Sequence, residues 1–182
     1  LSGAIDTDKK HSHLNTVHSR GARVVAEAVI PNAVMKKMMH ADTRNMYAAR
    51  QVSTVGGLLA GTTNNGLHAA NALAALFIAT GQDAANVAES QAGITYVDLR
   101  ENGDLYWSIT LPSLIVATYG GGTGLATQRE CLEMLDCYGT GKVLKFAEIC
   151  AATVLAGELS LAGAVVAGDW VESHDNLGRN RP

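Results

Sequence analysis

Hydrophobic and polar positions alternate along some stretches of the chain and recur at helical spacing along others. Residues 23–30 alternate and are rich in β-branched side chains, which predicts a strand. Residues 68–83 contain an apolar run with helical periodicity that is apolar most of the way round, as in a buried core helix. Asn64 or Asn65 is predicted to cap its start, and Gly81 to end it in a left-handed conformation.

Turn residues and periodicity predict the remaining elements. Asn102-Gly103 indicates a type I′ hairpin turn between two strands. Gly56-Gly57 is predicted to end a helix. The predicted helices are residues 32–40, 43–55, 83–90 and 125–135, and the predicted strands are residues 93–99, 104–111 and 114–119.

The last long segment, residues 142–173, predicts one helix of roughly 45 Å at 1.5 Å per residue. Much of it is apolar enough to resemble a membrane span. Glu158 at its centre would cost about 2.5 to 3.5 kcal/mol in a bilayer, and alanine and glycine add little membrane affinity. The segment is therefore interpreted as a core helix, with no membrane segment in this chain.

Composition narrows the class of protein. The chain has 182 residues, which suits one domain with a sizeable core. Its 14 basic and 17 acidic residues give a net charge of −3, so nothing indicates a nucleic-acid partner or attraction to a membrane surface. The three cysteines lack metal-ligand spacing, which favours free thiols in a reducing compartment. Because the chain opens on Leu1, we expect a fragment of a longer protein.

Polar residues at the start of the chain and on the central helix leave alternatives open. Asp-x-Asp followed by His11, His13 and His18 is compatible with a metal cluster, but a solvated polar segment explains it equally well. His68 and Asn71 lie three residues apart and share a helix face. They are either satisfied buried polar groups or site residues.

A glycine run at residues 120–124 suggests a phosphate-binding loop but lacks its fingerprint. Leu125 or Thr127 stands where the dinucleotide pattern needs its last glycine. Gly139-Thr-Gly-Lys142 fails as a P-loop because Asp136 replaces its first glycine. A glycine turn before a helix remains, which either meets an anion or is only a tight turn.

Three groups with useful chemistry stand out: Lys9, Asp83 and His174, the last near a helix C-terminus that favours its protonated form. They belong to the motifs Thr7-Asp8-Lys9-Lys10, Gly81-Gln82-Asp83, Tyr119-Gly-Gly-Gly-Thr123, Ala156-Gly-Glu-Leu-Ser-Leu161 and Ser173-His174. In order and spacing these motifs closely resemble the catalytic part of 3-hydroxy-3-methylglutaryl-coenzyme A (HMG-CoA) reductases. The resemblance runs from about Ser2 to Arg179.

The resemblance implies an α+β fold, with long buried helices packed against short strands. The chain corresponds to the later half of the family's large catalytic domain. Residues 1–20 form the substrate and lysine loop, and residues 21–182 form a helical core with a β hairpin. The small nucleotide-binding domain, the catalytic glutamate and the first nucleotide motif lie upstream of this segment in the family and are not in this chain.

The resemblance also implies the chemistry. The activity would be NADPH-dependent reduction of HMG-CoA to mevalonate and coenzyme A, in the cytoplasm for this part. The site would be shared within a homodimer or higher oligomer, and the isolated fragment would be inactive. Lys9, Asp83 and His174 match the catalytic lysine, aspartate and histidine. The positions that match binding residues are Ser2, Asp8, Lys10 and Asn71 for substrate, His68 near the coenzyme A end, and Gly120, Gly121, Gly122 and Thr123 for the nucleotide.

Several positions depart from the family pattern. A substrate-binding lysine is replaced by Val52, with Arg50 as a possible substitute. Ala4 replaces an asparagine, and Asn180 stands where animal members carry a regulatory serine. The changes at Val52 and Ala4 motivate one alternative, a non-catalytic relative that dimerises and binds coenzyme A. A metal-binding module built on the three histidines is the second.

Overall fold

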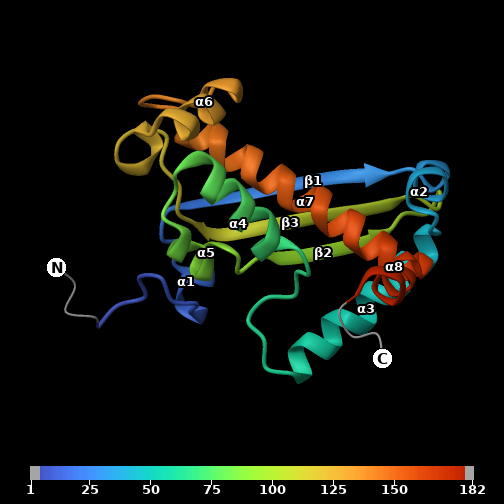
Figure 1. Cartoon of the computed structure of the whole chain (residues 1–182). Coiled ribbons are helices and arrows are strands. Elements are labelled where there is room, and N and C mark those ends of the chain that lie inside the picture. The colour runs from blue at the N-terminus through green and yellow to red at the C-terminus, as the bar shows by residue number, and fades with distance from the viewer. Residues whose placement is uncertain (1–4, 179–182) are drawn as a thin grey trace.

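A three-stranded antiparallel sheet is the platform of the fold in the computed structural model, which describes residues 5–178 (Figure 1). The strands β1 (Ala22–Ile30), β2 (Ile94–Leu99) and β3 (Leu105–Leu114) lie in the order β1-β3-β2. In the register, Ala26 pairs with Ile109 and Val97 pairs with Trp107. Paired side chains share a face, so the register separates an apolar face from a mixed one.

The long helix α7 (Val143–Ala167) crosses the apolar face of the sheet, with α4 (Ala69–Thr80) beside it (Figure 1). The core lies between these helices and the sheet, and Trp107, Phe146 and Phe77 are fully buried in it. The remaining helical elements are α1 (His13–Val17), α2 (Asn32–Met39), α3 (Thr43–Leu59), η1 (Ala84–Asn86), α5 (Val87–Ser90), η2 (Gly121–Gly124), α6 (Ala126–Met134) and α8 (Asp169–Leu177).

The predicted α+β class is confirmed, as are several local elements. The predicted strand at residues 23–30 is β1. Gly81 ends α4 with φ 69°, the left-handed conformation that glycine adopts without a Cβ penalty. The hairpin of β2 and β3 forms, but only Gly103 has positive φ, at 85°. A type I′ turn needs two such residues, so that turn type was wrong; the Gly103 position fits a three-residue loop with a bulge.

Two predicted helix ends were wrong. Helix α3 runs through Gly56-Gly57 to Leu59, and the left-handed residue is Gly61, with φ 76°. Glycine inside a helix costs about 1 kcal/mol but does not end it unless the chain turns there. The predicted single helix at residues 142–173 is two helices, because Gly168 takes φ 88° and ends α7.

Two further predictions fail. Residues 114–119 do not form a separate strand, since β3 ends at Leu114 and the chain continues irregularly. The central helix α4 is not buried all round: Ile78 is 67% exposed and Ala75 is also exposed. Its second apolar face therefore lies at the surface of this chain.

Helix α7 is, within residues 5–178, the one helix long and apolar enough to cross a membrane. Its inner face packs against β1, β3 and α4. The charged Glu158 in its middle is fully buried and surrounded by backbone donors. This packing agrees with the interpretation of a core helix.

Candidate active site

Lys9 and Asp83 form an ion pair, with the lysine Nζ 2.7 Å from the aspartate carboxylate. Asp83 is held at the start of η1, where its carboxylate accepts a hydrogen bond from the Ala85 N–H at 3.1 Å. Lys9 lies in a turn closed by a hydrogen bond from the Lys10 N–H to the Thr7 carbonyl. The fold thus brings together two of the three groups predicted to be catalytic.

Each member of the pair shifts the pKa of the other. The hydrogen bond with Asp83 raises the pKa of Lys9 above 10.5, and the hydrogen bond with Lys9 lowers the pKa of Asp83 below 3.8. The contribution of Asp83 to folding stability is lost as pH falls through its depressed pKa. The contribution of Lys9 to folding stability is lost as pH rises through its raised pKa. Both side chains are nearly half exposed and remain charged around neutral pH.

The other predicted substrate residues of the lysine loop bind within the loop. Asp8 accepts a hydrogen bond from the Arg20 guanidinium at 2.7 Å. The Lys10 ammonium lies 3.4 Å from the Asp6 carboxylate and donates to the Asp8 carbonyl at 3.0 Å. Ser2 lies outside the described residues. The loop therefore presents a cluster of alternating charges beside Asp83.

The glycine run lies next to the ion pair. Gly120, Gly121 and Gly122 line the same hollow as Asp83, and a Cβ on Gly120 or Gly121 would meet nothing. Their backbone is therefore exposed at this hollow and open to a ligand. Thr123 is instead buried, and its hydroxyl donates to the Gly120 carbonyl at 2.6 Å, so its side chain shapes the turn.

His68 and Asn71 line a second hollow along α4, together with Thr153 of α7. The predicted shared face is therefore confirmed. The His68 Nδ1 atom is buried and has no hydrogen-bond partner among the described residues. A Cβ on Gly157 would lie 2.1 Å from this atom. Glycine at this place on α7 is what leaves room for the imidazole.

Glu158 caps the helix that carries these two residues, a role the sequence did not predict. One of its carboxylate oxygens accepts hydrogen bonds from the N–H groups of Leu67 and His68 at 2.7 Å and of Ala69 at 3.2 Å. The predicted caps are wrong, because Asn65 instead pairs with the backbone of Thr95 on β2 and Asn64 makes no cap bond. The sequence did carry one sign: a lone carboxylate in an apolar helix needs buried donors.

His174 does not join the pair within one chain. It lies on α8, its ring stacks on Trp170 with centroids 3.9 Å apart, and its Nδ1 is 2.7 Å from the Trp170 carbonyl. Helix α8 follows and packs against α7. Figure 1 shows α8 at the right of the view, whereas the lysine loop lies with α1 and α5 at the left, at the other end of the molecule. The third predicted catalytic group is therefore remote from the first two.

Arg50 is not placed to substitute for the lysine that the resemblance predicts at position 52. The Arg50 side chain is 3% exposed, lies over the Trp107 ring and donates to the Asn65 carbonyl at 2.7 Å. The Val52 side chain points outward and is 74% exposed. Residues two apart on a helix face different directions.

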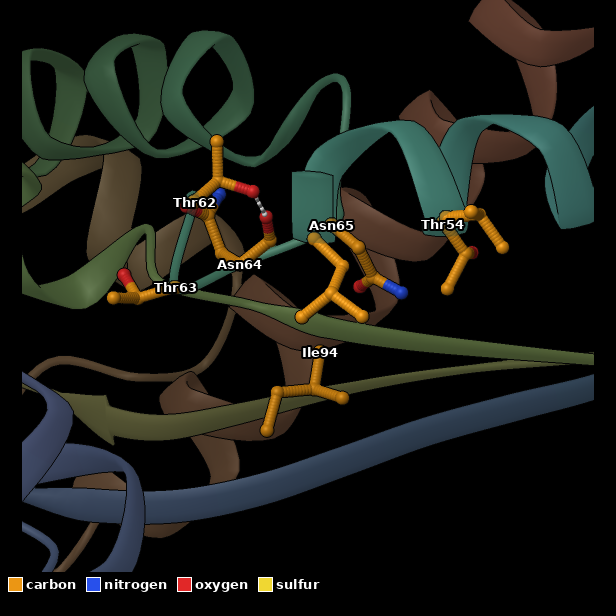
Figure 2. A pocket seen from close by; sticks show the side chains of 8 residues that line it. Thr54, Thr62, Thr63, Asn64, Asn65 and Ile94 are labelled. Atoms are coloured by element: carbon orange, nitrogen blue, oxygen red, sulfur yellow. Dashed lines mark hydrogen bonds between the residues drawn. The ribbon is translucent and has the colours of Figure 1, made fainter. Parts of the chain in front are cut away.

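A shallow hollow lies beside this end of α3 (Figure 2). Thr54 contributes from the helix, Asn64 and Asn65 from the following loop, and Ile94 from β2. Its lining is uncharged. The hollow therefore offers no replacement for the ammonium that the resemblance predicts at position 52.

The metal-binding alternative receives no support from the described residues. Between residues 5 and 178, no three His, Cys, Asp or Glu side chains converge on one point. His11 instead contacts the hydroxyl of Thr63, with its Nδ1 2.7 Å away. Partial burial lowers the pKa of His11.

The fold and the site together describe an α+β protein in which an ion-paired lysine lies beside an open glycine turn. An ammonium so placed suits chemistry at a carbonyl oxygen, where negative charge develops. A family model described as hydroxymethylglutaryl-coenzyme A reductase matches residues 1–179. The chain belongs to the hydroxymethylglutaryl-coenzyme A reductase family.

Individual relatives agree. The chain is 47% identical to the 3-hydroxy-3-methylglutaryl-coenzyme A reductase of Aeropyrum pernix and 42% identical to that of Methanocaldococcus jannaschii. Each alignment covers 98% of this chain but only 44% of the relative. A Hevea brasiliensis reductase is 42% identical over 99% of this chain and 90% of its own length. The chain thus spans less than half the length of the archaeal relatives.

Proposed function

We propose that the protein containing this chain reduces HMG-CoA to mevalonate and coenzyme A with NADPH. The observation that carries the proposal is the Lys9–Asp83 pair at 2.7 Å, beside the open backbone of Gly120–Gly122. Family membership supplies the substrate class. The relatives' names do not specify the nucleotide, so the choice of NADPH is part of the proposal.

Lys9 would stabilise the charge that forms on the substrate oxygen. A nicotinamide nucleotide supplies a hydride when bound. The Lys9 ammonium, held charged by Asp83, would donate to the oxygen of the thioester carbonyl and later of the aldehyde as each gains negative charge. Asp83 would orient the ammonium.

His174 would act as the acid for the leaving group. Thiols such as coenzyme A have a pKa of about 8.5, so a donor that titrates near neutrality eases departure of the sulfur. Its distance from Lys9 within the chain supports a site shared between two copies in a homodimer or higher oligomer. Asp8, Lys10, Ser2 and Asn71 would bind the substrate, with His68 near the coenzyme A end. We place this catalytic part in the cytoplasm.

The decisive experiment uses the full-length protein. Loss of nicotinamide absorbance from NADPH is followed with and without HMG-CoA, and mevalonate is identified as the product. We expect substrate-dependent oxidation; its absence from a folded oligomeric protein would refute the proposal. NADH in place of NADPH tests the nucleotide preference.

The alternative is a non-catalytic relative that dimerises and binds coenzyme A. The specific observation in its favour is the exposed Val52, where the family pattern has a substrate-binding lysine. Coenzyme A binding without any thioester reduction would favour this alternative. Restoring the ammonium with Val52→Lys would then be the natural next variant.

His174→Gln is predicted to separate the two half-reactions. Thioester reduction should be lost because it expels a thiolate, while reduction of free mevaldehyde, which expels none, should be retained. Both rates are measured on the same preparation. Equal losses in the two assays would argue against a leaving-group role.

Gly157→Ala is predicted to weaken coenzyme A binding roughly five- to tenfold, because its Cβ would occupy the position of the His68 imidazole. Calorimetric titration of the full-length protein with coenzyme A measures the change. Gly56→Ala is the matched control, since a Cβ there meets nothing. Equal affinities in the two variants would contradict the assignment of His68.

A further inference from the structure

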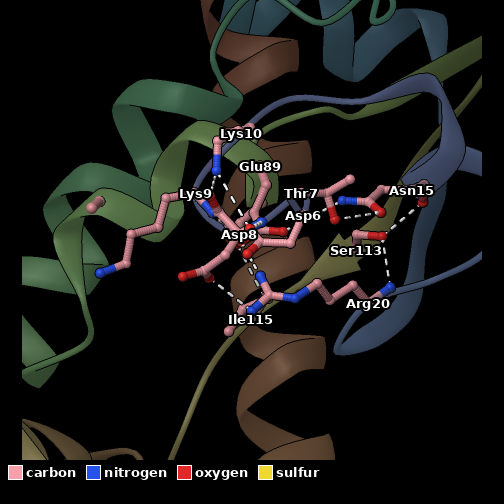
Figure 3. Close-up of polar contacts among 12 residues, drawn as sticks. Asp6, Thr7, Asp8, Lys9, Lys10, Asn15, Arg20, Glu89, Ser113 and Ile115 are labelled. Atoms are coloured by element: carbon pink, nitrogen blue, oxygen red, sulfur yellow. Dashed lines mark hydrogen bonds and ion pairs between the residues drawn. The ribbon is translucent and has the colours of Figure 1, made fainter. Parts of the chain in front are cut away.

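A buried carboxylate and an arginine hold the loop that carries Lys9 (Figure 3). Glu89, on α5, is 1% exposed. One of its oxygens accepts a hydrogen bond from the Lys9 backbone N–H at 3.0 Å and an ion-pair contact from Arg20 Nη1. Its other oxygen accepts from the Asn15 side chain at 3.4 Å. Arg20 also binds Asp8 with its second terminal nitrogen, at 2.7 Å.

These contacts hold Lys9, whose backbone conformation is unfavourable. Lys9 has φ 57°, in the left-handed region that is unfavourable for a residue other than glycine. Such a conformation persists only when its surroundings impose it. The Glu89 bond holds the backbone of Lys9 itself, and the Arg20 bond holds the side chain of the preceding Asp8. Glu89 and Arg20 therefore hold two consecutive residues of the loop, Asp8 and Lys9.

The same short segment also holds the far end of the lysine. Asp83 starts η1, and Glu89 follows on α5, so the two carboxylates belong to one local unit. Asp83 binds the Lys9 ammonium and Glu89 binds the Lys9 backbone N–H. A two-point attachment fixes both the position and the direction of the side chain.

We propose that Glu89 and Arg20 are positioning residues, which hold Lys9 in the left-handed conformation that directs its ammonium to Asp83. The catalytic consequence rests on the proposed function; the effect on Lys9 itself does not. Both carboxylate oxygens of Glu89 accept hydrogen bonds from residues of the loop, and an apolar residue at this position could accept none.

The test measures the reactivity of Lys9 in the full-length protein. Wild type, Glu89→Gln and Arg20→Gln are trace-labelled with acetic anhydride below the lysine pKa, and acetylation of Lys9 relative to Lys37 is read by mass spectrometry. Lys37 is exposed on α2 and serves as the internal reference. We expect Lys9 labelling to rise roughly three- to tenfold in both variants, because an ammonium released from Asp83 loses its proton more easily.

The matched control is Glu133→Gln, which removes another glutamate–arginine pair, to Arg129 at 2.7 Å on α6. It should leave Lys9 labelling unchanged. Arg20 is 40% exposed, so Arg20→Gln keeps the test decisive if Glu89→Gln does not fold. Wild-type Lys9 labelling in a folded Arg20→Gln or Glu89→Gln protein would overturn the proposal.

Turnover gives a second readout that a purely structural role would not produce. Misdirecting the ammonium should lower kcat roughly 10- to 100-fold with KM changed less than about threefold. Labelling needs no turnover, so the two proposals fail separately. If Lys9 labelling rises in the variants but the wild-type protein itself shows no reductase activity, the proposed function alone is refuted. If the wild-type protein is active but Lys9 labelling is unchanged in the variants, the positioning role alone is refuted.

Discussion

Lys9→Ala is expected to lower thioester reduction by the full-length protein at least about 100-fold. Removing one preorganised donor to a developing oxyanion typically costs 10²–10³ in kcat. Lys9 carries a full charge, held by Asp83 with its pKa raised, so its loss should lie at or above that range. The measurement is substrate-dependent NADPH oxidation at saturating HMG-CoA.

The control for this prediction is Lys37→Ala, which removes a lysine from the exposed face of α2. It should retain wild-type kcat. Asp83→Asn should resemble Lys9→Ala more than the control, since it leaves the ammonium without the partner that directs it. Near-normal turnover of Lys9→Ala would remove the pair from the mechanism.

Glu158→Ala is expected to lower the free energy of unfolding by about 3–5 kcal/mol. The substitution leaves the N–H groups at the start of α4 without the acceptor that the fully buried Glu158 side chain provides. It also removes the negative charge that faces the buried Arg50, whose pKa burial already lowers and Glu158 partly restores. One substitution therefore leaves the α4 N–H groups without their acceptor and Arg50 without a neighbouring negative charge.

Urea-induced unfolding of the full-length protein measures this loss. Glu148→Ala provides the comparison, because Glu148 lies on the exposed face of the same helix and should change stability by less than about 0.5 kcal/mol. Glu158→Gln should fall between the two, since its carbonyl oxygen can still accept. An unfolding midpoint for Glu158→Ala equal to that of Glu148→Ala would show that the cap contributes nothing.

The predictions for Lys9 and Glu158 are linked through helix α4. Helix α4 begins at the Glu158 carboxylate and ends at Gly81, where a Cβ would lie 2.2 Å from the Gly122 carbonyl oxygen. Its start therefore places His68 and Asn71, and its end places Asp83 against the glycine run. Displacing the helix at its capped end should disturb both hollows, so we expect Glu158 variants that fold to lose activity as well.

Local patterns in the sequence determined much of this protein. Alternation identified β1, and Gly81 marked the end of α4, because both depend on residues close together in the chain. The motifs around Lys9, Asp83 and His174 also identified the family before any geometry was known. Their catalytic and binding roles remain predictions.

Only the tertiary structure decided which distant residues meet. Nothing near Leu67 or His68 in the sequence indicates that Glu158, on another helix, replaces Asn64 or Asn65 as the cap. The orientation of Arg50 toward Trp107 and the grip of Glu89 on Lys9 were equally hidden. Such contacts follow from the packing of α4, α5 and α7 around one sheet, and long-range packing leaves no periodic signal in the segments that it joins.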